Sequence, residues 1–459
     1  MANIGYIQVV RHCNHFCGFC SNPTTPYVHT FETMKVLVDD FVARGYFGVI
    51  LTGGEPSLHP ELPRVARYAT ERGLHVRMIT NGTRLADEGF AKEMAEAGLR
   101  IVHVSVYSVR PEVEARLRGM PGTLEKAFAA VDNAHRYGIE VNINCVINKL
   151  NADHLDENIR YWIARHPYIS HFVWNNMDPS MGRAEVNQAQ YTPRLADFEL
   201  SLHRALRLLQ QSGRTFRVEK VPLCYMADFA WASTETRKIV KGEERIVHFL
   251  DVKQTVRQTD WEHIYAPGCS VCTLRPICGG LFDRGNAYDP GELHPVFIDR
   301  DAVVQKIIQD PKDPSYQFRS MDAWREDFAR RLEEARRQPP RAERKSEDET
   351  LRGMSPPDAP AVGVVTGECQ DSCRLNSISQ TALTTSSRRL RTASLEPPEV
   401  VPSEPFLGLS RNDTLVSVTP RSDRPSRLRG CRTLIETSAS RSHRLVCRDH
   451  RDGWRSRAA

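Results

Sequence analysis

The sequence lacks any long apolar run, and none approaches the roughly 18 residues that a membrane-spanning helix requires. Its first residues also lack the charged, apolar and small residues, in that order, that mark a signal peptide. The formal net charge is only +5 over 459 residues, and its sign depends on an arginine-rich end. These absences argue against a membrane protein, give no case for a nucleic-acid-binding surface and predict a cytoplasmic protein.

Cysteine, by contrast, is plentiful, with twelve residues in the chain. In a protein that stays in the reducing cytosol, clustered cysteines are expected to bind metals rather than to form disulfides. The chain is also too long for one ordinary hydrophobic core, so we expect two or more domains.

The first cysteine group has the spacing Cys13-x3-Cys17-x2-Cys20 and follows a strand-like run at 5–10. Thiolates this close can converge on one soft metal centre. A four-iron cluster normally takes four thiolates, so three would leave one iron open to a small molecule, as in catalytic metal sites. Taken alone, the triplet is equally compatible with a zinc site in which His12 or His15 is the fourth ligand.

Strand and helix patterns alternate from residue 4 to about 184. Glycines stand where the helices should end, at 45, 73, 98 and 138. Such alternation predicts a parallel sheet with helices outside, and six units are too few for an eightfold barrel, so we expect an open, partial (β/α)6 barrel. The expected strands are 4–10, 47–51, 75–79, 100–106, 140–147 and 171–174, and the expected helices are 30–44, 61–72, 85–97, 123–137 and 152–165.

Two further motifs follow predicted strands, Gly53-Gly54-Glu55-Pro56 and the turn that contains Asn81. The cysteine loop, the aromatic Phe19 before its last cysteine and the Gly-Gly-Glu-Pro turn together resemble the radical S-adenosylmethionine (radical SAM) superfamily. The resemblance implies a [4Fe-4S] cluster on Cys13, Cys17 and Cys20. It also implies reductive cleavage of S-adenosylmethionine to a 5′-deoxyadenosyl radical that abstracts hydrogen from a substrate, with a low-potential donor such as flavodoxin or ferredoxin.

In parallel barrels the functional residues gather where the strands end. Gly53 and Gly54 would let the backbone approach the methionine ammonium, and the charge of Glu55 would lie near it. Ser105 is equally well explained as an ordinary strand-end hydroxyl, and Arg118 as a solvated arginine rather than a carboxylate ligand. Cys145 is expected to pack in an apolar strand. The residues expected to bind the cofactor are Phe19, Gly53, Gly54, Glu55, Pro56, Asn81, Ser105, Arg118 and Asn144.

A second cysteine group comprises Cys224 and the run Cys269-x2-Cys272-x5-Cys278. It resembles the Twitch and SPASM extensions of radical SAM enzymes, which bind auxiliary four-iron clusters, although Phe282 stands where a full SPASM domain has another cysteine. We therefore expect a shortened region with one auxiliary cluster, and the alternative is a structural zinc site. The polar–apolar alternation over 237–256, with Lys241-Gly242 at a turn, predicts a hairpin.

The stretch 141–151 resembles the fifth strand of the GTP 3′,8-cyclase of molybdenum-cofactor synthesis, but the second cysteine spacing differs from that family's Cys-x2-Cys-x13-Cys. Four ligands would leave no iron free for substrate, which favours electron relay or structural support. A ribosomally made peptide is the first substrate hypothesis, and a small metabolite or nucleotide is the second. A non-catalytic, zinc-stabilised binding protein is the alternative of another class.

The predicted organisation has four parts. Residues 1–184 form a radical SAM core, and 185–318 form the Twitch/SPASM-like α+β region. Residues 319–338 form an amphipathic helix that packs on the body through Met321, Trp324, Phe328, Leu332 and Ala335. The segment 339–459 is rich in Arg, Ser, Thr and Pro, and is predicted to be disordered.

Overall fold

The computed structural model describes residues 4–22, 27–243, 246–248, 255–257, 263–311 and 320–337. All of them lie within a compact unit that spans Met1–Asp371. The tail predicted at 339–459 lies outside the described residues.

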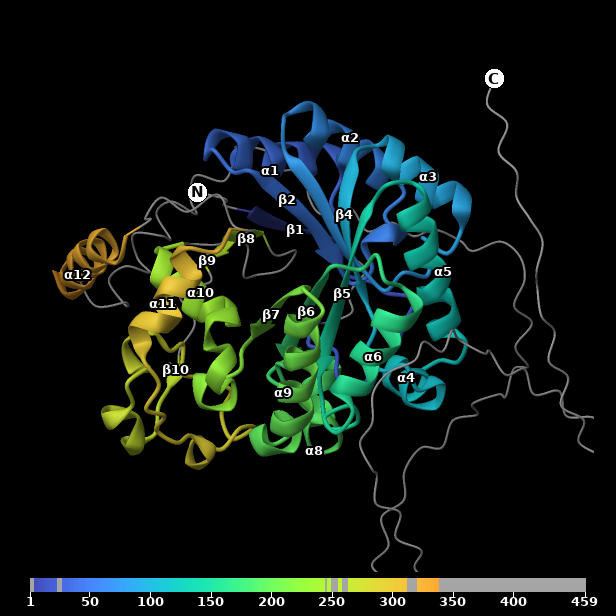
Figure 1. Ribbon diagram of the computed structural model, residues 1–459. Coiled ribbons are helices and arrows are strands. Elements are labelled where there is room, and N and C mark those ends of the chain that lie inside the picture. Colours follow the sequence, from blue (N-terminus) through green and yellow to red (C-terminus); the bar gives the residue numbers. More distant parts are fainter. Residues whose placement is uncertain are drawn as a thin grey trace, which may run out of the picture. The chain divides into compact units, whose positions relative to one another are not determined.

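A nine-stranded sheet forms the centre of this unit, in the order β7-β6-β5-β4-β3-β2-β1-β8-β9 (Figure 1). Neighbouring strands from β1 to β8 pair in parallel, and β9 pairs with β8 in the antiparallel direction. The sheet curls with helices outside it, which confirms the open, partial (β/α) barrel and adds β7 and β8 to the six strands expected. The strands are β1 (Ile4–Val10), β2 (Gly48–Gly53), β3 (His75–Thr80), β4 (Leu99–Ser105), β5 (Glu140–Ile147), β6 (His171–Asn176), β7 (Thr215–Glu219), β8 (Ile246–His248), β9 (Thr255–Arg257) and a separate antiparallel pair, β10 (His263–Ile264) and β11 (Leu281–Phe282).

The helices follow the strands as the alternation predicted, with short helices added between them. No helix among the described residues combines the length and apolar character needed to cross a membrane. The α-helices are α1 (Phe31–Ala43), α2 (Leu62–Glu71), α3 (Glu88–Glu96), α4 (Pro111–Arg118), α5 (Thr123–Arg136), α6 (Leu155–Arg165), α7 (Gly182–Val186), α8 (Gln188–Tyr191), α9 (Leu195–Gln211), α10 (Thr234–Lys241), α11 (Arg300–Ile308) and α12 (Met321–Arg337). The 3-10 helices used below are η1 (Pro56–Leu58), η2 (Leu223–Tyr225), η5 (Pro267–Val271) and η6 (Arg275–Ile277).

Helix α1 illustrates how local sequence sets these elements. Thr30 caps its N-terminus by accepting a hydrogen bond from the Thr33 amide at 3.2 Å. Gly45 follows its C-terminus with φ 69°, a left-handed conformation that glycine adopts without steric cost. Met34, Val38 and Phe41 are fully buried against the sheet. Burying each such side chain stabilises the fold by roughly 1.5–3 kcal/mol, so the predicted apolar face holds α1 in place.

The hairpin predicted over 237–256 is wrong in its first half. Residues Thr234–Lys241 form helix α10, and Gly242 ends it with φ 65° instead of making a hairpin turn. The side chains that suggested alternation fit a helix with one buried face, because Val240 is fully buried and Arg237 and Lys241 are largely buried. Antiparallel pairing does occur further on, between β8 and β9.

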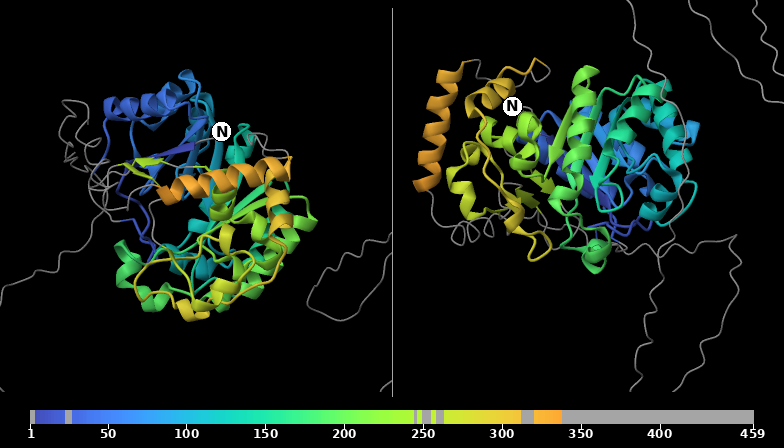
Figure 2. Two further views of the ribbon diagram at one scale, coloured as in Figure 1. Left: turned by 90° about the vertical axis from the view of Figure 1, so that its left-hand side faces the viewer. Right: turned by 60° about the horizontal axis from the view of Figure 1, so that its bottom comes forward.

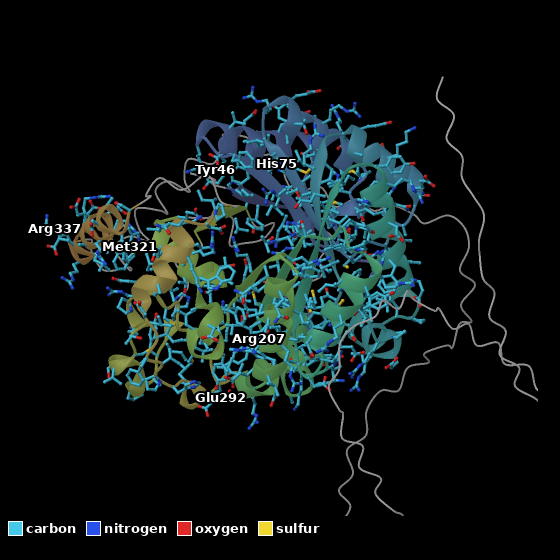
Figure 3. All side chains as sticks on the ribbon, viewed as in Figure 1. Tyr46, His75, Arg207, Glu292, Met321 and Arg337 are labelled. Atoms are coloured by element: carbon cyan, nitrogen blue, oxygen red, sulfur yellow. The ribbon has the colours of Figure 1, made fainter. Side chains whose placement is uncertain are left out.

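Helix α12 lies within the segment expected to form an amphipathic helix, and it contacts α10 through Trp324 and Arg331. Trp324 is 1% exposed and donates through Nε1 to the Val240 carbonyl at 2.9 Å. Arg331 donates to the carbonyls of Ile239 and Val240 at 2.8 and 2.9 Å. These bonds satisfy carbonyls at the end of α10 that have no partner within the helix. Leu332, expected on the packed face, is 45% exposed instead; Figure 2 shows α12 on the outside of the fold, and Figure 3 labels its ends.

The segment that carries the second cysteine group is tied to the barrel helices by Glu292 (Figure 3). Its carboxylate accepts hydrogen bonds from the backbone amides of Leu195 and Ala196 at 3.2 and 3.4 Å, at the N-terminus of α9. A carboxylate there satisfies free amide groups and complements the helix dipole. Tyr225 in η2 donates to the Glu292 carbonyl at 2.7 Å, so the same residue links both segments.

Candidate active site

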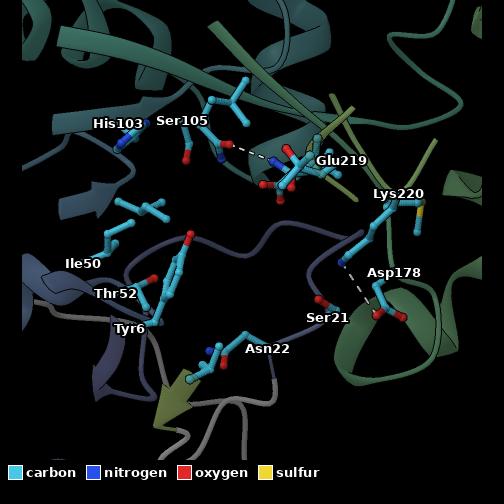
Figure 4. A pocket seen from close by; sticks show the side chains of 18 of the residues that line it. Tyr6, Ser21, Asn22, Ile50, Thr52, His103, Ser105, Asp178, Glu219 and Lys220 are labelled. Carbon is cyan, nitrogen blue, oxygen red and sulfur yellow. Dashed lines mark hydrogen bonds and ion pairs between the residues drawn. The ribbon is translucent and has the colours of Figure 1, made fainter. Parts of the chain in front are cut away.

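A cavity of about 670 Å³ lies within the curl of the sheet, at the ends of the strands (Figure 4). Side chains from β1 to β8 and from helix α10 line it. The predicted site residues among its lining are Cys13, Cys17, Phe19, Cys20, Gly53, Gly54, Glu55, Asn81, Ser105 and Asn144. The sheet therefore brings together almost every residue that the sequence placed in one site.

The three thiols of the first group all line this cavity and are free. Burial raises the pKa of Cys17 to about 12 and also raises the pKa of Cys13. A buried thiol with a raised pKa stays protonated unless a metal replaces its proton. Cys13 accepts a hydrogen bond from the His15 amide at 3.4 Å, the kind of contact that stabilises a thiolate once it is bound.

Gly53 and Gly54 allow the cysteine loop to pack closely on the end of β2. Gly53 has φ 152°, and a Cβ on Gly54 would lie 2.1 Å from the His12 carbonyl oxygen. The Gly54 amide donates to the Val10 carbonyl at 2.8 Å, and the Glu55 amide donates to the His12 carbonyl at 3.0 Å. The close approach that requires glycine is therefore made by the protein's own backbone; contact with a cofactor stays a prediction.

Glu55 joins the ends of β2 and β3. Its carboxylate accepts hydrogen bonds from the Ser57 hydroxyl and the Thr80 hydroxyl at 2.6 Å each, and from the Asn81 amide at 2.7 Å. The side chain is 1% exposed, and burial raises the pKa of its carboxyl. Pro56 begins η1 directly behind Glu55 and is also buried. This network fixes Asn81, whose side chain donates to Asn14 of the cysteine loop at 2.8 Å.

Arg118 lies behind the cavity wall rather than on it and is fully buried. Its Nε donates to Glu114 at 2.5 Å, and a second nitrogen donates to Nδ1 of His15 at 3.1 Å. It also donates to the carbonyl of Ser105. The alternative of a solvated surface arginine is wrong, and a direct bond to the cofactor carboxylate stays a prediction.

His15 is fixed by these contacts as a neutral ring. Because arginine can only donate, Nδ1 of His15 accepts and Nε2 carries the hydrogen that it donates to Thr83 at 2.9 Å. Burial and the charge of Arg118 lower the pKa of His15 to about 3. With both ring nitrogens bonded to protein atoms, His15 does not fit the zinc ligand considered above.

The remaining expected residues form an amide and aromatic wall. Ser105 pairs with Asn144 in register, and Asn175 on β6 donates to the Asn144 side chain at 2.9 Å. Phe19 packs edge-on against Tyr107 with their ring centroids 4.7 Å apart. Cys145 is 4% exposed within β5, as expected of a packing residue.

The sequence did not reveal a group of charged residues that also lines the cavity. Glu235, Arg237 and Lys238 of α10 line the cavity, beside Lys220 after β7. Lys220 has φ 60°, an uncommon conformation for a residue with a side chain, and its ammonium lies 3.9 Å from Asp178 (Figure 4). The positions of Asp178 and Lys220 could have pointed to them, because Asp178 follows the end of β6 and Lys220 follows the end of β7.

The four cysteines of the second group lie among the described residues, and all four are free thiols. Cys224 lies in η2, Cys269 lies in η5, and Cys272 and Cys278 follow η5 and η6. Backbone amides of Val296 and Gly280 donate to the sulfurs of Cys272 and Cys278 at 3.4 and 3.3 Å. Burial raises the pKa of Cys224 to about 11 and raises that of Cys278, and the charge of Cys269 adds to both shifts. Amide-to-sulfur bonds suit bound thiolates, so the donor chemistry of the set is compatible with a cluster.

Within the described residues, no three His, Cys, Asp or Glu side chains gather as ligands of a single metal ion. In a four-iron cluster each thiolate binds a different iron, so its ligands need not converge on one point. The donor chemistry of both groups, free thiols with amide donors to sulfur, fits such clusters.

Comparison with known sequences finds a family model that matches the first part of the chain. Residues 7–161 match the family model described as the Radical SAM superfamily. The chain is 35% identical over 149 residues to Fe-coproporphyrin III synthase of Methanosarcina barkeri, covering 32% of this chain and 37% of that protein. It is 31% identical over 155 residues to GTP 3′,8-cyclase of Xanthomonas axonopodis pv. citri, covering 31% and 46%.

A longer match, 26% identical over 229 residues, is to PqqA peptide cyclase of Ruegeria pomeroyi and covers 48% of this chain and 59% of that protein. The chain thus spans 37–59% of the length of these three relatives.

Proposed function

We propose, from the membership of residues 7–161 in the radical SAM superfamily, that this chain is an oxidoreductase. It would bind a [4Fe-4S] cluster through Cys13, Cys17 and Cys20, with S-adenosylmethionine beside it. The observation that carries the proposal is that these three thiols line one cavity together with the polar ends of neighbouring strands. When bound, the cluster and its cosubstrate supply the electron and the 5′-deoxyadenosyl radical that abstracts hydrogen from a substrate.

The chain's own residues would bind and orient the cosubstrate and would exclude water from it. Asn81, Ser105 and Asn144 line the cavity where they can hold polar groups of the cosubstrate. Glu55 places a carboxylate at the same wall, where it would attract an ammonium group. Phe19 would supply backbone and ring contact to the base, while Pro56 and Arg118 would support the wall from behind.

A peptide is the substrate class that we favour. The match to PqqA peptide cyclase extends over 229 residues, well beyond the length of the family domain. The wall formed by Lys220, Glu235, Arg237 and Lys238 offers both signs of charge, which suits backbone and charged side chains of a peptide.

A small metabolite or nucleotide is the second candidate. The names of the two other relatives, Fe-coproporphyrin III synthase and GTP 3′,8-cyclase, favour it. An entirely apolar substrate fits less well, because Lys220, Glu235, Arg237 and Lys238 line the cavity.

The second cysteine group, Cys224, Cys269, Cys272 and Cys278, would bind an auxiliary [4Fe-4S] cluster in a shortened Twitch/SPASM-like region. Four thiols complete the ligand set, so this cluster would relay electrons or support the fold rather than bind substrate. A low-potential donor such as flavodoxin or ferredoxin would reduce the enzyme in a cytoplasmic compartment, where the eight described cysteines stay free.

Anaerobic reconstitution of the full chain tests the proposal. We expect a brown protein with iron and sulfide in excess of zinc, and cleavage of S-adenosylmethionine after reduction by dithionite. Cys17→Ala should abolish cleavage, whereas Cys145→Ala, at a buried thiol outside both groups, should retain it. A colourless, zinc-loaded chain would support the non-catalytic, zinc-stabilised binding protein instead.

A further inference from the structure

Helices α7 and α8 lie against the outside of the cysteine loop, although nothing in the cysteine motif itself calls for them. Their contacts involve the carbonyl groups of the loop. Arg183 donates through Nε to the Cys17 carbonyl at 2.8 Å, and Asn187 donates to the Gly18 carbonyl at 3.0 Å. The Ala184 amide donates to the Cys20 carbonyl at 3.1 Å.

The packing around these bonds leaves almost no free space. Gly182 has φ 62°, and a Cβ there would lie 2.8 Å from the Cys20 carbonyl oxygen. A Cβ on Gly18 would lie 2.5 Å from the ring of Tyr191 in α8. Tyr191 is 6% exposed and packs near Phe19 with ring centroids 6.1 Å apart.

We infer that Gly182–Tyr191 is a clamp that holds the cysteine loop in its ligand-presenting conformation, and that Arg183 raises the reduction potential of the cluster bound there. The effect of Arg183 on the reduction potential rests on the proposed function, whereas the clamp on the cysteine loop does not. Arg183 is a positioning residue in this account, because it acts through the peptide of Cys17.

The electrostatic reason is the charge of the reduced state. One-electron reduction adds a negative charge to the cluster, and potentials of such clusters respond to nearby charge, hydrogen bonds and solvent exposure. The guanidinium of Arg183 is one hydrogen bond away from the peptide group of a ligand cysteine. A cation at that distance stabilises the reduced form more than the oxidised form.

A second arginine at the loop, Arg118, forms an ion pair with Glu114 at 2.5 Å, and both side chains are fully buried. Removing the charge of Arg118 would strand a buried carboxylate, so its effect on the potential would be mixed with a loss of stability. The test therefore uses Arg183. Arg183→Gln keeps a hydrogen-bond donor and loses the charge, and Arg183→Lys keeps the charge.

The potential is measured on the reconstituted full chain by EPR-monitored redox titration, following the reduced-cluster signal that changes when S-adenosylmethionine is added. We expect Arg183→Gln to make reduction about tenfold less favourable, which is about 59 mV for a one-electron couple. Arg183→Lys should stay near the wild type. Arg194→Gln, which removes an arginine side chain that is 75% exposed at the start of α9, should change nothing. Equal potentials for wild type and Arg183→Gln would overturn the redox role.

Hydrogen exchange on the metal-free chain tests the clamp separately. Asn187→Leu removes the bond to Gly18, and we expect amides of residues 16–22 to exchange faster than in the wild type while β5 is unchanged. Unaltered exchange in 16–22 would overturn the clamp. If the wild type gives no cluster signal that responds to S-adenosylmethionine, the proposed function and the effect of Arg183 on the potential are both overturned. The exchange result would still decide whether Gly182–Tyr191 holds the cysteine loop.

Discussion

The guanidinium of Arg118 donates to Nδ1 of His15 at 3.1 Å and thereby fixes the proton of that ring on Nε2, opposite Thr83. This contact spans 103 residues of sequence and joins helix α4 to the cysteine loop. Glu114 balances the charge, and its second oxygen accepts from the amides of Tyr107 and Ser108 at 3.0 and 2.8 Å. The buried pair is thus part of a network that supports the loop from beneath.

Arg118→Met should destabilise the protein by about 3–5 kcal/mol, because it leaves the Glu114 carboxylate buried without its cation. Chemical denaturation of the metal-free chain, followed by circular dichroism, measures the loss. Glu114→Gln combined with Arg118→Met should recover part of it. Lys92→Met, at an exposed pair with Glu96, should cost less than about 1 kcal/mol. An equal, small effect for Arg118→Met would show that the pair does not brace the loop.

Gly54→Ala should displace the cysteine loop without unfolding the barrel. The new Cβ would lie 2.1 Å from the carbonyl oxygen of His12, which precedes Cys13, and 2.4 Å from that of Arg11. Disturbing the support of a metal site typically lowers its affinity about 10–100-fold, so iron retained after reconstitution and desalting should fall severalfold. The control is Gly89→Ala in α3, where only exposed Asp87 must adjust. Wild-type iron content in Gly54→Ala would contradict the role given to this glycine.

The sequence predicted the barrel well, and the structure places the three cysteines of the first group at one cavity; both the barrel and the motif depend on local patterns. The helical period of apolar residues, the glycines that end helices and the Cys-x3-Cys-x2-Cys spacing can be recognised without knowing which residues are in contact in the fold. The role of Gly54 could not be foreseen in detail, because the atoms that would clash with a Cβ there belong to residues 11 and 12, which follow the neighbouring strand β1. Arg118 likewise looked like a solvated arginine, because its contacts with His15, Asn81 and Ser105 join residues that are far apart in the sequence.

The error at α10 has a different physical cause. Ile239, Val240, Ile246 and Val247 alternate with polar residues, and a short amphipathic stretch of this kind fits either a strand or a helix. Tertiary contacts favour the helix, because Trp324 and Arg331 donate hydrogen bonds to the Val240 carbonyl in its last turn. The clamp residues 182–191 carried no chemical motif, so their role emerged only from contacts with the loop.

Cys278→Ser should remove one of two clusters and leave the other. If both groups hold four-iron clusters, this change should release about half of the iron and sulfide, and Cys17→Ser should release the other half. Cys145→Ser is the matched control, since Cys145 is a buried thiol in β5 outside both groups. Iron and sulfide are measured per chain after anaerobic reconstitution. Unchanged iron together with loss of zinc in Cys278→Ser would identify the second site as structural zinc.

Stability should fall as the pH is lowered from about 6.5 toward 4, in part because of His29. Burial lowers its pKa in the folded chain from 6.5 to about 4. Between these values the unfolded chain takes up a proton that the folded chain does not, so unfolding becomes more favourable as pH falls. His29→Gln removes this uptake and should flatten the pH dependence of the denaturation midpoint between pH 7 and 5. His135→Gln, at an exposed position on α5, should leave the dependence as in the wild type. An equally steep dependence in His29→Gln would show that other buried histidines, such as His15 and His171, account for the acid sensitivity.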